Sequence, residues 1–189
     1  MVQLNDEFDI RLGDIVVGET FCTNLNTKTG KCESRGQVSW WVRQALAKLE
    51  LHPLLENGSC WYNPQSKHLA NLAEHHFKYV AWENDPRRNA RNSSRSRSNR
   101  VPQVHLGNAF VIEDESEFPP KVLDVLRARK EWTSKPTVLT RTTLVETFPC
   151  IIICGVAHYY NYMMEPSGGW KNYAAFKAAQ YVKRLVSIL

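Results

Sequence analysis

The sequence predicts an α+β protein in which a helical N-terminal domain precedes a small α-β-β-β-α module with a three-stranded antiparallel sheet. Apolar residues recur with helical spacing in the first half of the chain. The last third instead alternates between helix-type stretches and short runs rich in β-branched and aromatic residues. Residues 84–100 separate the two parts, because they contain no large apolar side chain.

The helical N-terminal domain is predicted over residues 1–83. Between residues 37 and 55, apolar side chains at positions 38, 41, 42, 45, 46 and 49 form one stripe of a helix, and Pro53 ends it. Residues 66–82 repeat the same kind of pattern. Residues 8–21 are also predicted to be helical, although the middle of this segment is β-branched.

Residues 84–118 are predicted to be an Arg-rich mobile loop followed by an acidic linker. The segment 84–100 has six Arg and one Asp, a net charge of +5, whereas 101–118 has four acidic and no basic residues, a net charge of −4. A loop without large apolar residues cannot offset the entropy lost on ordering by burying surface. Its positive charge is the kind that a polyanionic partner attracts.

The C-terminal module is predicted over residues 119–189. Pro119 and Pro120 stand where a helix can begin, and apolar spacing continues that helix to about Trp132. Three extended runs follow at residues 137–145, 148–156 and 158–164, and a long helix occupies 170–189. Two helices on one face of a three-stranded sheet would bury the apolar side of every element.

Composition limits the compartment and the cofactors. The chain has 189 residues, 43% hydrophobic residues and a net charge of +5, and it contains no apolar run of about 18 residues. Its acidic start does not resemble a signal peptide, so we expect an intracellular protein without a membrane partner. Five cysteines, an odd number spaced unlike zinc ligands, predict reduced thiols and neither a metal site nor a cofactor.

The stretch Pro120–Leu123, the order of elements after it, and Ser167–Ala179 with the sequence SGGWKNYAAFKAA together resemble a double-stranded RNA-binding domain. The resemblance implies that the start of the last helix contacts RNA phosphates through Lys171, Asn172 and Lys177. Independently of any family, the N–H groups and dipole of a helix start favour phosphate. The chain departs from the family at Asn172, where a Lys is usual, and in the loop 144–149, which lacks a Gly-Pro-x-His element.

The segment Asn5–Asp14, which ends in Leu-Gly-Asp, together with the helix 38–51, is similar to a ribonuclease III domain. This resemblance implies that Asp14 could be one metal-binding carboxylate of a nuclease. The signature glutamate is replaced by Ile10, and a second acidic helix is not recoverable. Cleavage by two metal ions requires several converging carboxylates, so the resemblance favours an inactive descendant.

Two enzymatic alternatives remain open at this point. The Cys60-Trp61 pair resembles the start of papain-like viral leader proteases, and His105 lies 45 residues downstream, so that an imidazole could activate the thiolate. The second alternative is a metal-dependent ribonuclease that uses Asp14.

The sequence favours a non-catalytic RNA-binding protein of a ribonucleoprotein or RNA-processing complex, with duplex RNA and other proteins as partners, over an enzyme. No catalytic or metal-binding residues are assigned. The predicted RNA-binding residues are Lys171, Asn172, Lys177, Arg87, Arg88, Arg91, Arg95, Arg97 and Arg100.

Overall fold

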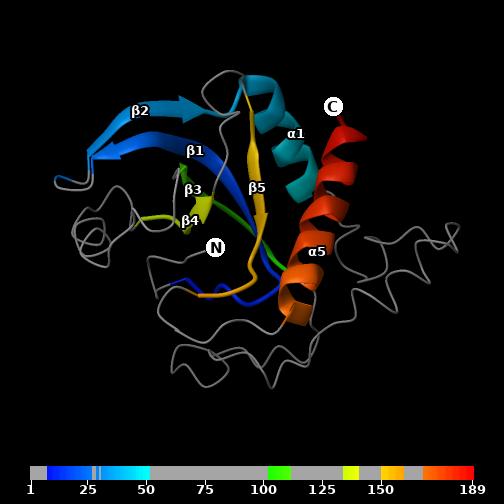
Figure 1. The fold of residues 1–189 in the computed structure, drawn as a ribbon. Coiled ribbons are helices and arrows are strands. Elements are labelled where there is room, and N and C mark those ends of the chain that lie inside the picture. Colours follow the sequence, from blue (N-terminus) through cyan, green and yellow to red (C-terminus); the bar gives the residue numbers. More distant parts are fainter. Residues whose placement is uncertain are drawn as a thin grey trace, which may run out of the picture.

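The computed structural model describes residues 8–26, 29, 31–51, 102–111, 134–140, 150–159 and 168–189. Five strands and two helices lie within these ranges (Figure 1). In chain order they are β1 (Ile15–Asn26), β2 (Lys31–Gln37), α1 (Trp40–Leu51), β3 (Val104–Val111), β4 (Thr137–Thr140), β5 (Ile152–Gly155) and α5 (Gly168–Val186). No helix in this part of the chain is long and apolar enough to cross a bilayer.

The strands form one mixed sheet around β1. The strand β3 pairs with β1 in parallel, and β4 pairs with β3 in parallel, which gives the order β2-β1-β3-β4. The other edge of the twelve-residue β1 has two antiparallel partners, β5 along Ile15–Gly18 and β2 along Thr20–Asn26. The starts of β1 and β3 therefore meet the end of β5 at one end of the sheet, where Ile15 faces both Val104 and Gly155.

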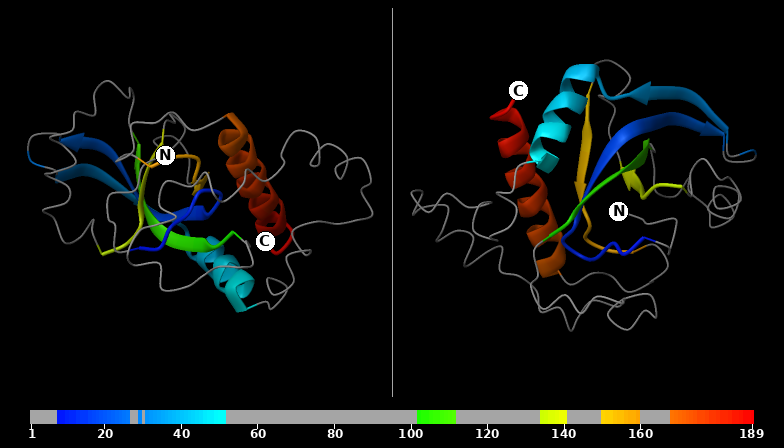
Figure 2. Two further views of the ribbon diagram at one scale, coloured as in Figure 1. Left: turned by 90° about the horizontal axis from the view of Figure 1, so that it is seen from below. Right: turned by 180° about the vertical axis from the view of Figure 1, so that it is seen from behind.

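Apolar side chains cover both faces of the sheet. Ile15 and Val17 of β1 pack in one cluster with residues of both helices, namely Ala45, Leu46, Leu49, Tyr181 and Leu185. Val16 points the opposite way, as strand alternation requires, into a second cluster with Ala109, Val138 and Ile152. Figures 1 and 2 show both helices on the same face of the sheet. A strand segment that is buried on both faces appears in the sequence as a continuous hydrophobic run, as Ile15–Val17 does.

The helix α5 lies unusually close to the sheet at Gly155. A Cβ atom at this position would be 2.0 Å from the backbone oxygen of Ala174 and 2.5 Å from its carbonyl carbon. Glycine is therefore the residue that lets β5 and α5 approach to backbone contact.

The hairpin of β1 and β2 contains a disulfide bond between Cys22 and Cys32. The prediction that all cysteines are reduced thiols is therefore wrong for this pair. Cys150 and Cys154 take no part in a disulfide bond, and burial raises the pKa of the Cys150 thiol from its ordinary value. The spacing of Cys22 and Cys32 matches no metal-binding motif. The pairing of β1 with β2, and not a bound metal ion, brings the two cysteines together.

The predicted helical N-terminal domain is wrong. The segment that begins at Ile15 is the central strand of the sheet, because its β-branched residues fit a pleated strand buried on both faces. The helix expected between 37 and 55 does form, as α1. The predicted helix 66–82 and the loop 84–100 lie outside the described residues, as do the domain boundaries at 83 and 118.

The predicted three-stranded antiparallel sheet in the C-terminal module is also wrong. The expected first and second strands contain β4 and β5, but β4 pairs with β3 and β5 pairs with β1. Ile152 faces one apolar cluster while Ile151 and Ile153 face the other, so β5 needs cover on both sides. In the observed sheet these two clusters supply that cover. The long last helix forms as expected, whereas the first helix and most of the third strand lie outside the described residues.

Candidate active site

A buried carboxylate lies at the end of the sheet where β1 and β3 begin. Asp14 immediately precedes β1 and is 2% exposed. The turn before it requires Gly13, whose φ of 87° lies in the left-handed region and whose missing Cβ makes room for the Tyr173 ring. Two backbone hydrogen bonds of 2.7 Å join this turn to the residue after β5: Gly13 N donates to Val156 O, and Val156 N donates to Asp14 O.

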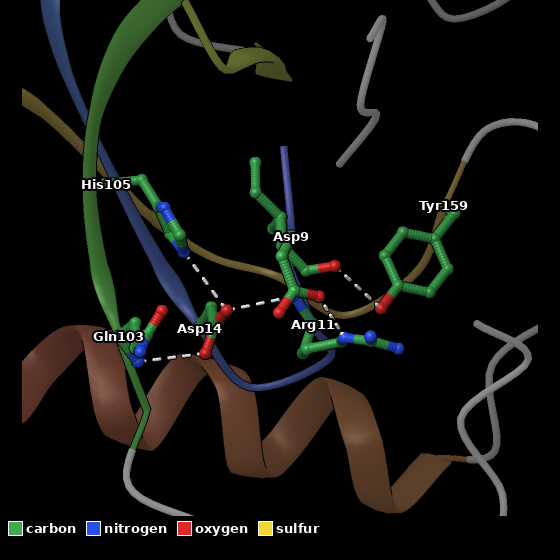
Figure 3. Close-up of polar contacts among 7 residues, drawn as sticks. Asp9, Arg11, Asp14, Gln103, His105 and Tyr159 are labelled. Carbon is green, nitrogen blue, oxygen red and sulfur yellow. Dashed lines mark hydrogen bonds and ion pairs between the residues drawn. The ribbon is translucent and has the colours of Figure 1, made fainter. Parts of the chain in front are cut away.

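The Asp14 carboxylate accepts hydrogen bonds from three separate groups (Figure 3). Arg11 N donates to Oδ2 at 2.9 Å, and Gln103 N donates to Oδ1 at 2.9 Å. His105 Nε2 lies 3.1 Å from Oδ2. Hydrogen bonds to an ionised acceptor are stronger than those between neutral groups, so Asp14 holds the start of β1 and the start of β3 together.

Parallel pairing places His105 beside Asp14. His105 pairs with Val16 across the two strands, and Asp14 is two residues before Val16 and so shares its face of the sheet. The His105 side chain is 17% exposed. Within the described ranges, the Asp14 carboxylate is the one polar group that contacts the His105 ring. When the ring is neutral and Nε2 donates to Asp14, the second ring nitrogen, Nδ1, is an acceptor.

Two further contacts hold the segment before Asp14 in place. The Arg11 guanidinium, which is 8% exposed, forms an ion pair with Asp9, and the Tyr159 hydroxyl donates to Ile10 O at 3.3 Å. Figure 3 shows these side chains on the side of Asp14 opposite His105 and Gln103. The carboxylate is therefore bound to its own segment on one side and to β3 on the other.

The structure brings together two residues that the sequence assigned to different hypotheses. Asp14 was expected as a nuclease carboxylate and His105 as a protease histidine, and their pairing was not predicted. Cys60 lies outside the described residues. The described residues contain no group of three or more His, Cys, Asp or Glu side chains that could bind a metal ion. The Asp14 carboxylate already accepts three hydrogen bonds from N–H donors, and the described residues give the metal-dependent ribonuclease no support.

The residues predicted to bind RNA are spread over regions of different character. Lys171 and Asn172 are exposed on the first turn of α5, beside the buried Trp170. Lys177 is half-buried, with its ammonium 5.5 Å and 5.7 Å from the ring centres of Tyr173 and Phe176. The six arginines from Arg87 to Arg100 lie outside the described residues. These positions do not test the individual phosphate contacts.

Burial gives Lys177 a measurable effect on stability. Desolvation lowers the pKa of Lys177, so the folded chain binds its proton less tightly than the unfolded chain. We expect Lys177→Met to raise the melting temperature at pH 7. This gain should shrink as the pH rises through the lowered pKa of the folded chain, and it should be lost above the ordinary lysine pKa, where neither state holds the proton. Thermal unfolding at several pH values measures this gain in melting temperature, and Lys171→Met, at an exposed lysine, is the control. A gain that grows with pH would contradict the lowered pKa of Lys177.

The fold removes the basis of the predicted RNA-binding function. The strands of the last third pair with β1 and β3, so the described residues do not form a double-stranded RNA-binding domain, and the strand β1 replaces the helices of a ribonuclease III domain. Both resemblances are therefore wrong. The predicted RNA-binding function and the preference for a non-catalytic protein are corrected together with these resemblances. The cysteine protease also lacks support, because the described partner of His105 is Asp14.

No family model matches the chain, and no curated protein matches it. The chain is similar to a solved structure named as a 5′-methylthioadenosine/S-adenosylhomocysteine nucleosidase from Borrelia burgdorferi bound to adenine, with a TM-score of 0.48 and 9% sequence identity. The match covers 100% of this chain and 66% of the length of that protein, which is an enzyme.

Proposed function

We propose that the chain carries a hydrolytic active site in which His105, held by Asp14, activates a water molecule. The contact of 3.1 Å between His105 Nε2 and the buried Asp14 carboxylate is the observation that carries this proposal. The carboxylate is itself held by the backbone N–H groups of Arg11 and Gln103, so its position relative to the ring is defined from both strands.

The Asp14 carboxylate selects the tautomer of His105. An Nε2–H that donates to the carboxylate leaves the lone pair on Nδ1, and a neutral imidazole with a free lone pair is the usual general base in proteins. The negative charge of Asp14 also stabilises the imidazolium that forms when Nδ1 takes up a proton. The low exposure of Asp14 strengthens this attraction, because water screens it less.

The reaction that this pair supports is the hydrolysis of one bond in a small substrate. His105 Nδ1 takes a proton from water while the water oxygen attacks an electrophilic carbon. The bond from that carbon to the leaving group breaks, and the leaving group receives the proton from His105. The net change converts R–X and water into R–OH and H–X, and it requires neither a metal ion nor an oxidant.

A hydrolysis assay tests the proposal with three probes: 5′-methylthioadenosine and S-adenosylhomocysteine, which contain an N-glycosidic bond, and p-nitrophenyl acetate, which contains an ester. We expect turnover of at least one probe, and His105→Gln should lower kcat by about 10²–10⁴-fold. Asp14→Asn should also lower kcat, whereas Asp9→Asn, at a carboxylate that does not contact His105, is the matched control. Absence of turnover with all three probes, or an unchanged kcat in His105→Gln, would contradict the proposal.

A second readout does not depend on the choice of substrate. At a pH at which the ring is neutral, nitrogen-15 NMR should show the proton on Nε2 and none on Nδ1. In Asp14→Asn the amide can replace the acceptor by a donor, so the preference for Nε2–H should weaken or reverse. A wild-type ring that carries its proton on Nδ1 would show that Asp14 does not orient a base.

A further inference from the structure

The outer side of α5 carries an apolar stripe that the fold leaves exposed. We call the five residues that form it the outer stripe. Val182 and Val186 are 39% and 63% exposed, and Leu189, three residues beyond the end of α5, is 64% exposed. Two exposed alanines extend the line toward the start of the helix. The complete outer stripe is Ala175, Ala179, Val182, Val186 and Leu189.

The spacing of the outer stripe is that of a helix-pairing seam. Successive members are separated by four, three, four and three residues, which is the a/d repeat of a coiled coil. The opposite side of α5 is occupied by the fold, because Trp170, Tyr173, Tyr181 and Leu185 are buried in the two apolar clusters. A surface helix that only covers its own sheet needs one apolar face, whereas α5 has two.

Charge around the outer stripe selects between possible occupants. The helix α5 contains three Lys and one Arg but no Asp or Glu. Lys171 and Lys183 are exposed, and Lys183 follows Val182 directly, which is the e position beside the seam. A second copy of α5 would bring like charges together along this edge. A helix with Glu or Asp beside its own apolar seam would instead place opposite charges next to these lysines.

We infer that the outer stripe of α5 is a docking surface for an acidic amphipathic helix of a partner protein. The partner helix places its apolar seam over Val182, Val186 and Leu189, and its acidic flank over Lys183. Apolar burial supplies the affinity, and the charge pattern excludes basic helices and a second copy of this chain.

A synthetic peptide pair tests the inference with the whole chain. The probe is a fluorescein-labelled helix of four heptads with Ile at a, Leu at d and Glu at e and g, and its counterpart has Lys at e and g. We expect fluorescence anisotropy to show saturable binding of the acidic peptide, and at least tenfold weaker binding of the basic one. Added salt should weaken the acidic complex, since the charges at its edge are exposed.

Variants of the chain locate the binding surface. The double variant Val182→Asn with Val186→Asn should weaken binding of the acidic peptide at least tenfold, and Lys183→Glu should weaken it as well. Lys48→Glu makes the same charge change at an exposed lysine of α1 and should leave binding unaltered. All four positions are exposed, and circular dichroism checks that the variants fold.

Three results would overturn the inference. One is that the acidic and basic peptides bind equally well, or that neither of them binds. Another is full binding by the double variant. The third is self-association of the wild-type chain in analytical ultracentrifugation that the double variant abolishes, because the occupant of the outer stripe would then be a second copy.

Discussion

The substitution Gly155→Val is expected to lower the free energy of unfolding by about 3 kcal/mol or more. Overpacking costs about 1–3 kcal/mol when side chains can yield, and it costs more when the backbone must move. The added Cβ would lie 2.0 Å from the backbone oxygen of Ala174. An atom of the helix backbone cannot rotate away, so the whole of α5 has to shift from β5. Chemical denaturation of Gly155→Val measures the loss.

Two further variants separate this steric clash from the general effect of adding a valine or removing a methyl group. Ala175→Val adds the same kind of side chain on the exposed side of α5 and should cost about 0.5 kcal/mol, the usual difference in helix propensity. Ala174→Gly should not rescue Gly155→Val, because the clash is with backbone atoms that glycine retains. Rescue by Ala174→Gly would show that β5 and α5 are separated by side chains.

Loss of the Asp14 carboxylate should have an effect of similar size. Asp14→Ala leaves the buried Arg11 N–H, the partly buried Gln103 N–H and the His105 ring without their acceptor, and each such group costs about 1–3 kcal/mol. We expect the free energy of unfolding to fall by about 3–5 kcal/mol, because three groups lose their acceptor at once. Denaturant titration at pH 7 is the measurement.

The control for Asp14→Ala is Asp9→Ala. The Asp9 side chain is 37% exposed and makes one ion pair, with Arg11, so its removal should cost less than the removal of Asp14, which is 2% exposed and accepts three hydrogen bonds. Amide hydrogen exchange supplies a second test, since the Gln103 N–H should lose protection in Asp14→Ala before the centre of β3 does. Equal effects of the two substitutions would show that Asp14 does not hold the two strands together.

The two described helices could be predicted from the sequence because a helix depends on local spacing. Residues 38–49 and 170–189 repeat apolar side chains at helical spacing, and they form α1 and most of α5. The strand β1 was mistaken for a helix because its apolar core spans only Ile15 to Val17, followed by a mixture of small and polar residues. The strand β1 extends to twelve residues because it pairs with three other strands. The spacing of apolar residues within β1 does not indicate these distant partners.

The candidate site could not be predicted because its parts are distant in the chain. Asp14 and His105 are separated by 91 positions, and Gln103 contributes a backbone N–H that no side-chain motif identifies. One signal was present: both residues stand at the start of an apolar run, and the starts of neighbouring parallel strands meet at one edge of a sheet. The signal predicts the contact only when it is already known that β1 and β3 are neighbouring strands.

The sequence by itself determined the helices α1 and α5, the extended runs that contain β4 and β5, and the basic character of the last helix. Only the tertiary structure decided which strands pair, that Cys22 bonds to Cys32, and that Asp14 meets His105. The physical reason is the range of the interactions. A helix satisfies its backbone hydrogen bonds within four residues, whereas a strand takes its partners from anywhere in the chain, and the choice rests on how the complete set of apolar faces can be buried.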